Sequence, residues 1–89
     1  MNTLQTRVSD FMKEMGWSYF STEKIISKID EELGEMKAEV ISGDVEKLEM
    51  EMGDLLFAIA CFCNKNNISM DEALSKAIGK DKVRDKNRY

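Results

Sequence analysis

The short run Ser42-Gly43-Asp44 interrupts an apolar pattern that otherwise has helical spacing. Apolar residues recur every three or four positions from Ile25 to Val40 before this run, and again from Val45 to Cys63 after it. Glycine commonly ends a helix and aspartate commonly caps the next one, so two helices are expected to meet at this turn. The sequence therefore predicts an antiparallel helical hairpin over residues 22–66.

Two further helices are predicted, one on each side of the hairpin. The first covers residues 3–15 and ends at Gly16, after which the aromatic run G-W-S-Y-F-S leads into the hairpin. The S-M-D-E run at residues 69–72 matches a capping box and opens the last helix. The apolar residues of that helix are Ala73, Leu74, Ala77 and Ile78.

The chain has 89 residues, which is enough for one domain and lies near the lower end of what a single core can keep folded. We expect three parts: an N-terminal helix (1–16), the hairpin (22–66), and a C-terminal helix with a basic tail that frays (70–89). The predicted fold class is all-α, a four-helix bundle with a central antiparallel hairpin. Because the chain is so short, we expect association to complete the bundle and predict a homodimer or homotetramer.

The composition limits the chemistry that this chain can perform. It contains no histidine, which excludes Ser-His and Cys-His nucleophilic mechanisms. Cys61 and Cys63 point to nearly opposite faces of a helix, so they cannot bridge each other, and no further Cys or His completes a zinc site. The net charge of −4 argues against nucleic acid as the main partner. With no disulfide framework, signal peptide or membrane span, we expect a cytoplasmic protein with no membrane partner.

Two acidic pairs with i, i+3 spacing lie on the two helices of the hairpin. At 3.6 residues per turn, Glu32 and Glu35 lie roughly 80° and 140° to one side of the apolar stripe of the first helix. Glu51 and Asp54 lie at roughly the same two angles on the second helix. When two antiparallel helices pack with their apolar stripes together, side chains at the same angle and on the same side of each stripe lie on one flank of the pair. The acidic pair at positions 46 and 49 falls on the opposite side.

The register of the hairpin brings these four side chains together. A turn centred on Gly43 sets Glu35 level with Glu51, and Glu32 level with Asp54, so we expect one compact square of carboxylates. Four carboxylates this close need a compensating cation, because like charges raise each other's pKa. Oxygen ligands without imidazole or thiolate suit Mg²⁺, or Mn²⁺ as an alternative. The opposing interpretation is a solvated acidic patch.

The runs E-E-L-G-E (31–35) and E-M-G-D-L-L-F (51–57) resemble the motifs of the MazG family of all-α nucleoside triphosphate pyrophosphohydrolases. In that family E-E-x-x-E is followed by E-x-x-D after a short helical hairpin. The resemblance implies a MazG-like bundle and Mg²⁺-dependent hydrolysis of a nucleoside triphosphate to the monophosphate and pyrophosphate. It also implies the metal ligands, which are Glu32, Glu35, Glu51 and Asp54.

The same resemblance implies roles for other charged residues. Glu31 and Glu35 match the two candidates for the base that deprotonates the attacking water. Lys80 and Arg84 match a family K-x-x-x-R, and Lys47 matches a family lysine, so these cations are expected to bind the substrate's phosphates. The alternative is that all three only solvate the surface.

Trp17 matches a tryptophan that the family often places before its E-E motif. There it is expected to bind the substrate by stacking on the base, although aromatic residues of this connector could instead close the bundle. Gly79 could end the last helix early. In that case Lys80 and Arg84 would not lie in one helix and would not share a face.

Gly34 and Gly53 lie inside the hairpin helices, where glycine costs about 1 kcal/mol relative to alanine. Both fall roughly 120° from the apolar stripe, on the side opposite the carboxylates, so we expect them to let another helix approach closely. Two alternatives for the function stay open. One is a narrower all-α enzyme acting on dUTP, dCTP or phosphoribosyl-ATP. The other is a non-catalytic dimerisation or regulatory module that uses its acids only for solubility.

Overall fold

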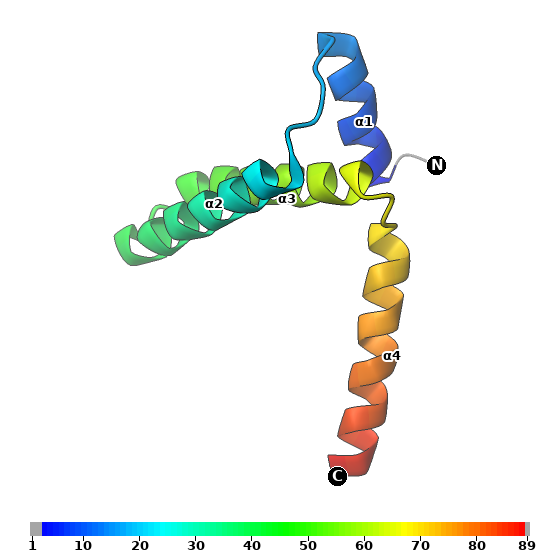
Figure 1. The fold of residues 1–89 in the computed structure, drawn as a ribbon. Helices are drawn as coiled ribbons and strands as arrows, with labels where there is room; N and C mark the ends of the chain where they lie inside the picture. The colour runs from blue at the N-terminus through cyan, green and yellow to red at the C-terminus, as the bar shows by residue number, and fades with distance from the viewer. Residues whose placement is uncertain (1–2, 89) are drawn as a thin grey trace.

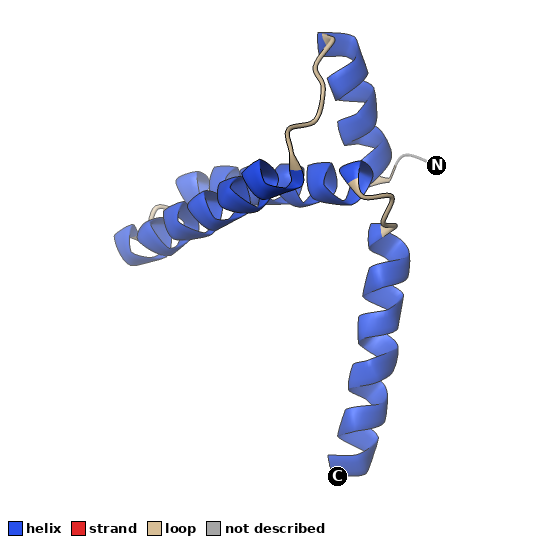
Figure 2. Ribbon diagram, in the orientation of Figure 1, coloured by secondary structure: helices blue, strands red, loops and turns tan. Residues whose placement is uncertain are grey.

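The computed structural model describes the backbone of residues 3–88 and the side chains of residues 3–84. It contains four helices: α1 (Leu4–Met15), α2 (Thr22–Ser42), α3 (Val45–Lys65) and α4 (Met70–Arg88) (Figure 1). Within that range only helices, turns and loops occur, and no strand (Figure 2). None of these four helices combines the length and apolar character needed to traverse a bilayer. The predicted all-α class, with four helices and a central hairpin, is confirmed.

Local chemistry sets the helix boundaries. Gly43 has a left-handed φ of 76°, which glycine adopts without the steric cost of a Cβ, and it ends α2. The carboxylate of Asp44 accepts the backbone N–H of Lys47 at 3.1 Å and starts α3. The hydroxyl of Ser69 accepts the N–H of Glu72 at 3.2 Å and starts α4 in the same way. The hairpin turn therefore lies where the sequence predicts it.

The apolar core lies at one end of the hairpin, where α1 crosses α3. Its buried members come from three helices: Val8, Met12, Ile25, Ala60 and Cys61. Small side chains dominate the α3 part of this core, so α1 and α2 can both approach α3 closely. Cys61 and Cys63 do not bridge each other, as expected. Both thiols are buried, and burial raises the pKa of both.

A polar network joins α1 to the start of α4. Gln5 donates from Nε2 to Asn64 Oδ1 at 3.0 Å and to the carbonyl of Ile68 at 2.6 Å, and its Oε1 accepts the N–H of Met70 at 2.6 Å. Asn64 in turn donates to the hydroxyl of Tyr19 at 3.1 Å. The first residue of α4 is therefore held against α1 by hydrogen bonds.

Beyond this anchor, α4 runs away from the other three helices (Figure 1). Residues 71–84 are all exposed. The helix continues through Gly79 to Arg88, which answers the question that Gly79 raised, so Lys80 and Arg84 belong to one helix. Fraying of the basic tail stays a prediction. The radius of gyration is 15.6 Å, whereas a compact domain of this length has about 12 Å. One chain alone therefore does not close the expected four-helix bundle.

Replacing Ile25 by alanine tests the core. Ile25 is 4% exposed, so removing its buried methyl and methylene groups should lower the free energy of unfolding by about 2–4 kcal/mol. Ile41 is 88% exposed, and Ile41→Ala should change it by less than about 0.5 kcal/mol. Urea unfolding at one fixed protein concentration measures both. Equal losses of free energy of unfolding in the two variants would contradict the position of the core described above.

Candidate functional site

Three carboxylates from two helices meet at the seam of the hairpin. Glu32, Glu35 and Glu51 each offer one carboxylate oxygen, and these three oxygens all lie within 4.8 Å of one another. Glu32 and Glu35 lie about one turn apart on α2, and Glu51 reaches them from α3. The predicted approach of Glu35 to Glu51 across the hairpin is therefore present.

Asp54 is not part of this group of three. It lines a cavity of about 440 Å³ together with Glu31 and Glu32, so it borders the same flank of the hairpin. Aspartate has one methylene group fewer than glutamate, and its carboxylate therefore reaches less far across the seam. Instead of the expected compact square, the site is a triangle of glutamates with an aspartate in the adjoining cavity.

Glu32 is the most constrained of these acids, because it is only 3% exposed. Its Oε1 lies 3.0 Å from Nζ of Lys28, and this charged hydrogen bond is the main reason why the pKa of Glu32 is lowered and that of Lys28 is raised. Its Oε2 is buried and has no hydrogen-bond partner among the described residues, and the same holds for Oε2 of Glu51. Buried acceptors without partners are costly.

Glu51 responds to its acidic neighbours in the opposite way. Its pKa is raised from 4.5 to about 7, chiefly because a protonated Glu51 can hydrogen-bond to the carboxylate of Glu35. Burial and the charges of Glu35 and Glu32 act in the same direction. Without a cation, a proton retained on Glu51 thus reduces the repulsion between the three carboxylates.

The residues present fit a hard divalent cation. They offer only carboxylate oxygens, which is the donor set that Mg²⁺ and Mn²⁺ prefer. The two buried oxygens without partners belong to Glu32 and Glu51 and so come from both helices. A cation between them would satisfy both and would remove the reason for Glu51 to hold a proton.

Lys28 belongs to this site, although the sequence analysis did not single it out. Its Nζ lies 3.7 Å from Glu31 Oε1 as well as 3.0 Å from Glu32 Oε1, and its side chain lines the same cavity as Asp54. The available signal was its i, i+4 spacing from Glu32. That spacing is common on solvated helix faces and therefore did not stand out.

A second cavity, rich in aromatic residues, adjoins the acidic one. It has a volume of about 520 Å³ and is lined by Trp17, Tyr19 and Phe20, among others. Trp17 is 54% exposed and meets the ring of Phe11 edge-on at 5.5 Å. The two cavities share four lining residues, which are Phe20, Ile25, Phe57 and Cys61. Together they form a continuous surface from the carboxylates to Trp17.

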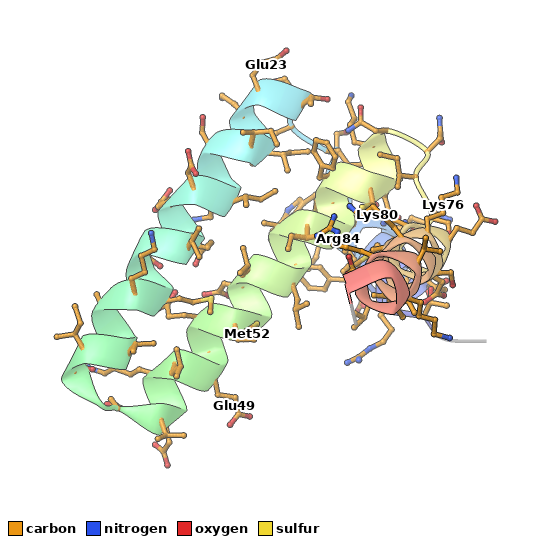
Figure 3. All side chains as sticks on the ribbon, turned by 90° about the horizontal axis from the view of Figure 1, so that it is seen from below. Glu23, Glu49, Met52, Lys76, Lys80 and Arg84 are labelled. Carbon is orange, nitrogen blue, oxygen red and sulfur yellow. The ribbon has the colours of Figure 1, made fainter. Side chains whose placement is uncertain are left out.

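The other predicted site residues are not members of the carboxylate triangle. Glu31 is exposed beside it, and Lys47 is exposed in the first turn of α3 with no ion pair to the three glutamates among the described side chains. Lys80 and Arg84 do share a face of α4, and Arg84 lies 4.0 Å from Asp81. Figure 3 shows α4 end-on with both cations, and Figure 1 shows that this helix leads away from the hairpin.

Comparison with known proteins relates the chain to one family of nucleotide pyrophosphohydrolases. Residues 20–89 match the model of the MazG nucleotide pyrophosphohydrolase domain. The uncharacterized protein YpjD of Bacillus subtilis strain 168 is 31% identical over an alignment of 99 residues that covers all of this chain and 89% of that protein. The nucleoside triphosphate pyrophosphohydrolase/pyrophosphatase MazG of Thermotoga maritima is 33% identical over 78 residues, which cover 88% of this chain and 29% of that protein.

A solved structure shares the fold. The crystal structure of YpjD from Bacillus subtilis, described as a candidate pyrophosphatase, matches with a TM-score of 0.81 and 32% sequence identity. The match covers 96% of this chain and 92% of the other. The similarity therefore extends over α1 and α4 as well as the acidic hairpin.

The raised pKa of Glu51 predicts a specific pH dependence for the metal-free protein. Between pH 4.5 and about 7 the folded chain holds a proton on Glu51 that the unfolded chain has lost, so this group makes folding less favourable as the pH rises through that window. Thermal unfolding in EDTA should show this loss in the wild type, and Glu51→Gln should remove that part of the pH dependence.

Carbon-13 NMR of the Glu51 carboxyl measures the same shift directly. Its midpoint should lie near pH 7 in the wild type and should fall in Glu35→Ala, which removes the largest cause of the shift. A midpoint near 4.5 in the wild type would contradict the described geometry.

Proposed function

This chain belongs to the MazG nucleotide pyrophosphohydrolase family, and from that membership we propose that it hydrolyses a nucleoside or deoxynucleoside triphosphate to the monophosphate and pyrophosphate in a Mg²⁺-dependent reaction. The observation that carries the proposal is the carboxylate triangle of Glu32, Glu35 and Glu51, with a buried oxygen on two of them that lacks a partner. Such a group is costly in a protein that has no cation to place there.

Glu32, Glu35 and Glu51 would hold the metal, with Asp54 as a fourth ligand from the adjoining cavity. When bound, Mg²⁺ neutralises phosphate oxygens and lowers the pKa of a coordinated water. Lys28 compensates one oxygen of Glu32, which leaves the other oxygen available. The helices α2 and α3 fix the positions of these carboxylates, because each ligand lies in the interior of a helix.

In the proposed reaction, the oxygen of a water molecule forms a bond to the α-phosphorus and the anhydride bond between the α- and β-phosphates breaks. Pyrophosphate leaves with the bridging oxygen, and a carboxylate accepts the proton of the water. Glu31 and Glu35 are the candidates for this base. Glu31 lines the cavity without belonging to the triangle and would serve only as a base, whereas Glu35 would also be a ligand.

The two adjoining cavities support an orientation for the substrate. The triphosphate would lie at the carboxylates and the base against Trp17, because the shared apolar residues join the two places. An aromatic ring stacks on any base, so this contact gives affinity without selecting a nucleotide. Lys47, Lys80 and Arg84 remain the proposed phosphate-binding cations, and Lys28 adds a fourth positive charge beside the cavity.

The alternative of a non-catalytic module is less well supported. Acids that serve solubility lie in water, whereas Glu32 is nearly fully buried. Specificity for dUTP, dCTP or phosphoribosyl-ATP stays open within the enzyme class. We also propose the cytoplasm as the compartment, because two free buried thiols fit a reducing environment.

Pyrophosphate release from a panel of NTPs and dNTPs, with Mg²⁺ or with EDTA, tests the function. Glu35→Ala should lower kcat/KM by at least about 100-fold, because metal ions contribute several kcal/mol and about 1.4 kcal/mol is tenfold in rate. Glu49→Ala is the matched control, since Glu49 is an exposed acid of α3 that points away from α2 (Figure 3). Its activity should equal that of the wild type. No release from any nucleotide would favour the non-catalytic module.

Trp17→Ala tests the orientation of the substrate. Loss of one stacking contact, worth about 1–3 kcal/mol, should raise KM about tenfold and leave kcat nearly unchanged, because the base lies away from the reacting bond. Trp17→Phe keeps an aromatic face and should restore most of the affinity. Steady-state kinetics on the best substrate of the panel gives both constants. A wild-type KM in Trp17→Ala would show that Trp17 serves only packing.

A further inference from the structure

Two lysines precede the acids on the face of α2 that borders the acidic cavity. Lys24, Lys28 and Glu32 follow one another at i, i+4 spacing, so they lie close to one line along the helix. Both lysines line the cavity of about 440 Å³, together with Glu31, Glu32 and Asp54. This cavity is therefore bordered by both signs of charge, although an acidic site alone would need only the carboxylates.

The cations that the sequence singles out do not border this cavity. Lys47, Lys80 and Arg84 are not part of its lining among the side chains that the structure describes. A polyphosphate that enters the cavity meets the carboxylates, which repel an anion at short range. Within one chain, the ammonium groups that can offset this repulsion from the cavity wall are those of Lys24 and Lys28.

The ammonium group of Lys28 retains donors for a ligand. An ammonium group has three N–H donors. The Nζ atom of Lys28 lies 3.0 Å from Glu32 Oε1, which is a hydrogen-bond distance, but 3.7 Å from Glu31 Oε1, which is longer than a hydrogen bond. Its side chain is 55% exposed. Lys28 can therefore donate to a phosphate oxygen while it keeps its bond to Glu32.

Lys24 lies where the acidic cavity meets the aromatic one. Its Nζ lies 5.4 Å from the centre of the Phe20 ring, a cation–π distance, and Phe20 lines both cavities. Lys24 is exposed and forms no ion pair with an acid among the described side chains. At a rise of 1.5 Å per residue, Lys24 and Lys28 are separated by about 6 Å along α2. One extended ligand can therefore contact both.

We propose that Lys24 and Lys28 form a phosphate-binding site within one chain, with Lys28 at the phosphate beside the carboxylates and Lys24 at the phosphate nearer to the aromatic cavity. The orientation agrees with the order of the two lysines along α2, from Phe20 to Glu32. The assignment of the ligand as the substrate's triphosphate rests on the proposed pyrophosphohydrolase activity. Binding of a polyphosphate to the two lysines can be measured without any reaction.

Calorimetric titration with inorganic tripolyphosphate in saturating Mg²⁺ tests the site, because this probe has neither base nor sugar. Lys24→Met and Lys28→Met keep a long apolar side chain and remove the charge, and each should raise the Kd about tenfold through loss of a charged hydrogen bond. Lys37→Met is the matched control, since Lys37 is an exposed lysine of α2 that lines neither cavity. Its Kd should equal that of the wild type. An unchanged Kd in both cavity variants, or a wild type that binds no tripolyphosphate, would overturn the proposal.

A second set of measurements separates phosphate binding from support of the fold. Lys28→Met also removes the partner of buried Glu32, so its helical content is checked by circular dichroism, and Lys28→Arg, which keeps the charge, should retain most of the affinity. Lys24→Met leaves the bond between Lys28 and Glu32 intact and so decides the proposal independently of stability. The nucleoside of the best substrate has no phosphate and should bind all folded variants equally. If the wild type bound tripolyphosphate but released no pyrophosphate from any nucleotide, the proposed function would fail while the phosphate site stood.

Discussion

The seam between α2 and α3 has to accommodate a nearly fully buried carboxylate, and much of the structure follows from that constraint. Glu32 lies in this seam with one oxygen paired to Lys28 and the other without a partner. A lone buried charge would oppose folding of the hairpin. Lys28 and the raised pKa of Glu51 together reduce this cost in the metal-free chain. The same arrangement leaves one buried carboxylate oxygen of Glu32, on α2, and one of Glu51, on α3, without a hydrogen-bond partner at this seam.

The hairpin consequently has three different regions along its length. At the end near α1, apolar side chains such as Met12, Ile25 and Ala60 form a small core. In the middle, the carboxylates lie on one flank, beside half-buried apolar side chains such as Met36 and Leu55. Near the turn, Val40 and Val45 are largely exposed. The cluster of buried apolar side chains lies in the first of these regions, so the fold of one copy depends on a core that is small for its length.

Local signals explain which parts of this arrangement the sequence predicted. Gly43 and Asp44 act on the backbone next to them, so the hairpin turn and its register could be read from the sequence. The meeting of Glu35 with Glu51 follows directly from that register. The direction of α4 could not be read, since it depends on a hydrogen bond between Gln5 and Met70, which are far apart in the chain.

The separation of Asp54 from the glutamates shows a second limit of sequence reasoning. Helical angles and register place Cα atoms, and by that measure Asp54 belongs with Glu32. Whether the carboxylates meet depends in addition on side-chain length and rotamer, which differ between aspartate and glutamate. The same reasoning explains why Lys28 was missed: its importance comes from the burial of Glu32, which no local pattern reveals.

The run E-M-E-M-G-D-L-L-F on α3 places two surfaces next to each other on one helix. Glu51 and Asp54 face the carboxylate flank, while Gly53 and Leu56 line a separate cavity of about 470 Å³ between α1 and α3. Successive residues of a helix differ by about 100° in direction, so adjacent positions can serve different surfaces. A side chain at Gly53 would project into this cavity, where an added Cβ would meet no atom within 4 Å. One helix can therefore hold the carboxylates on one side and line a second cavity on the other.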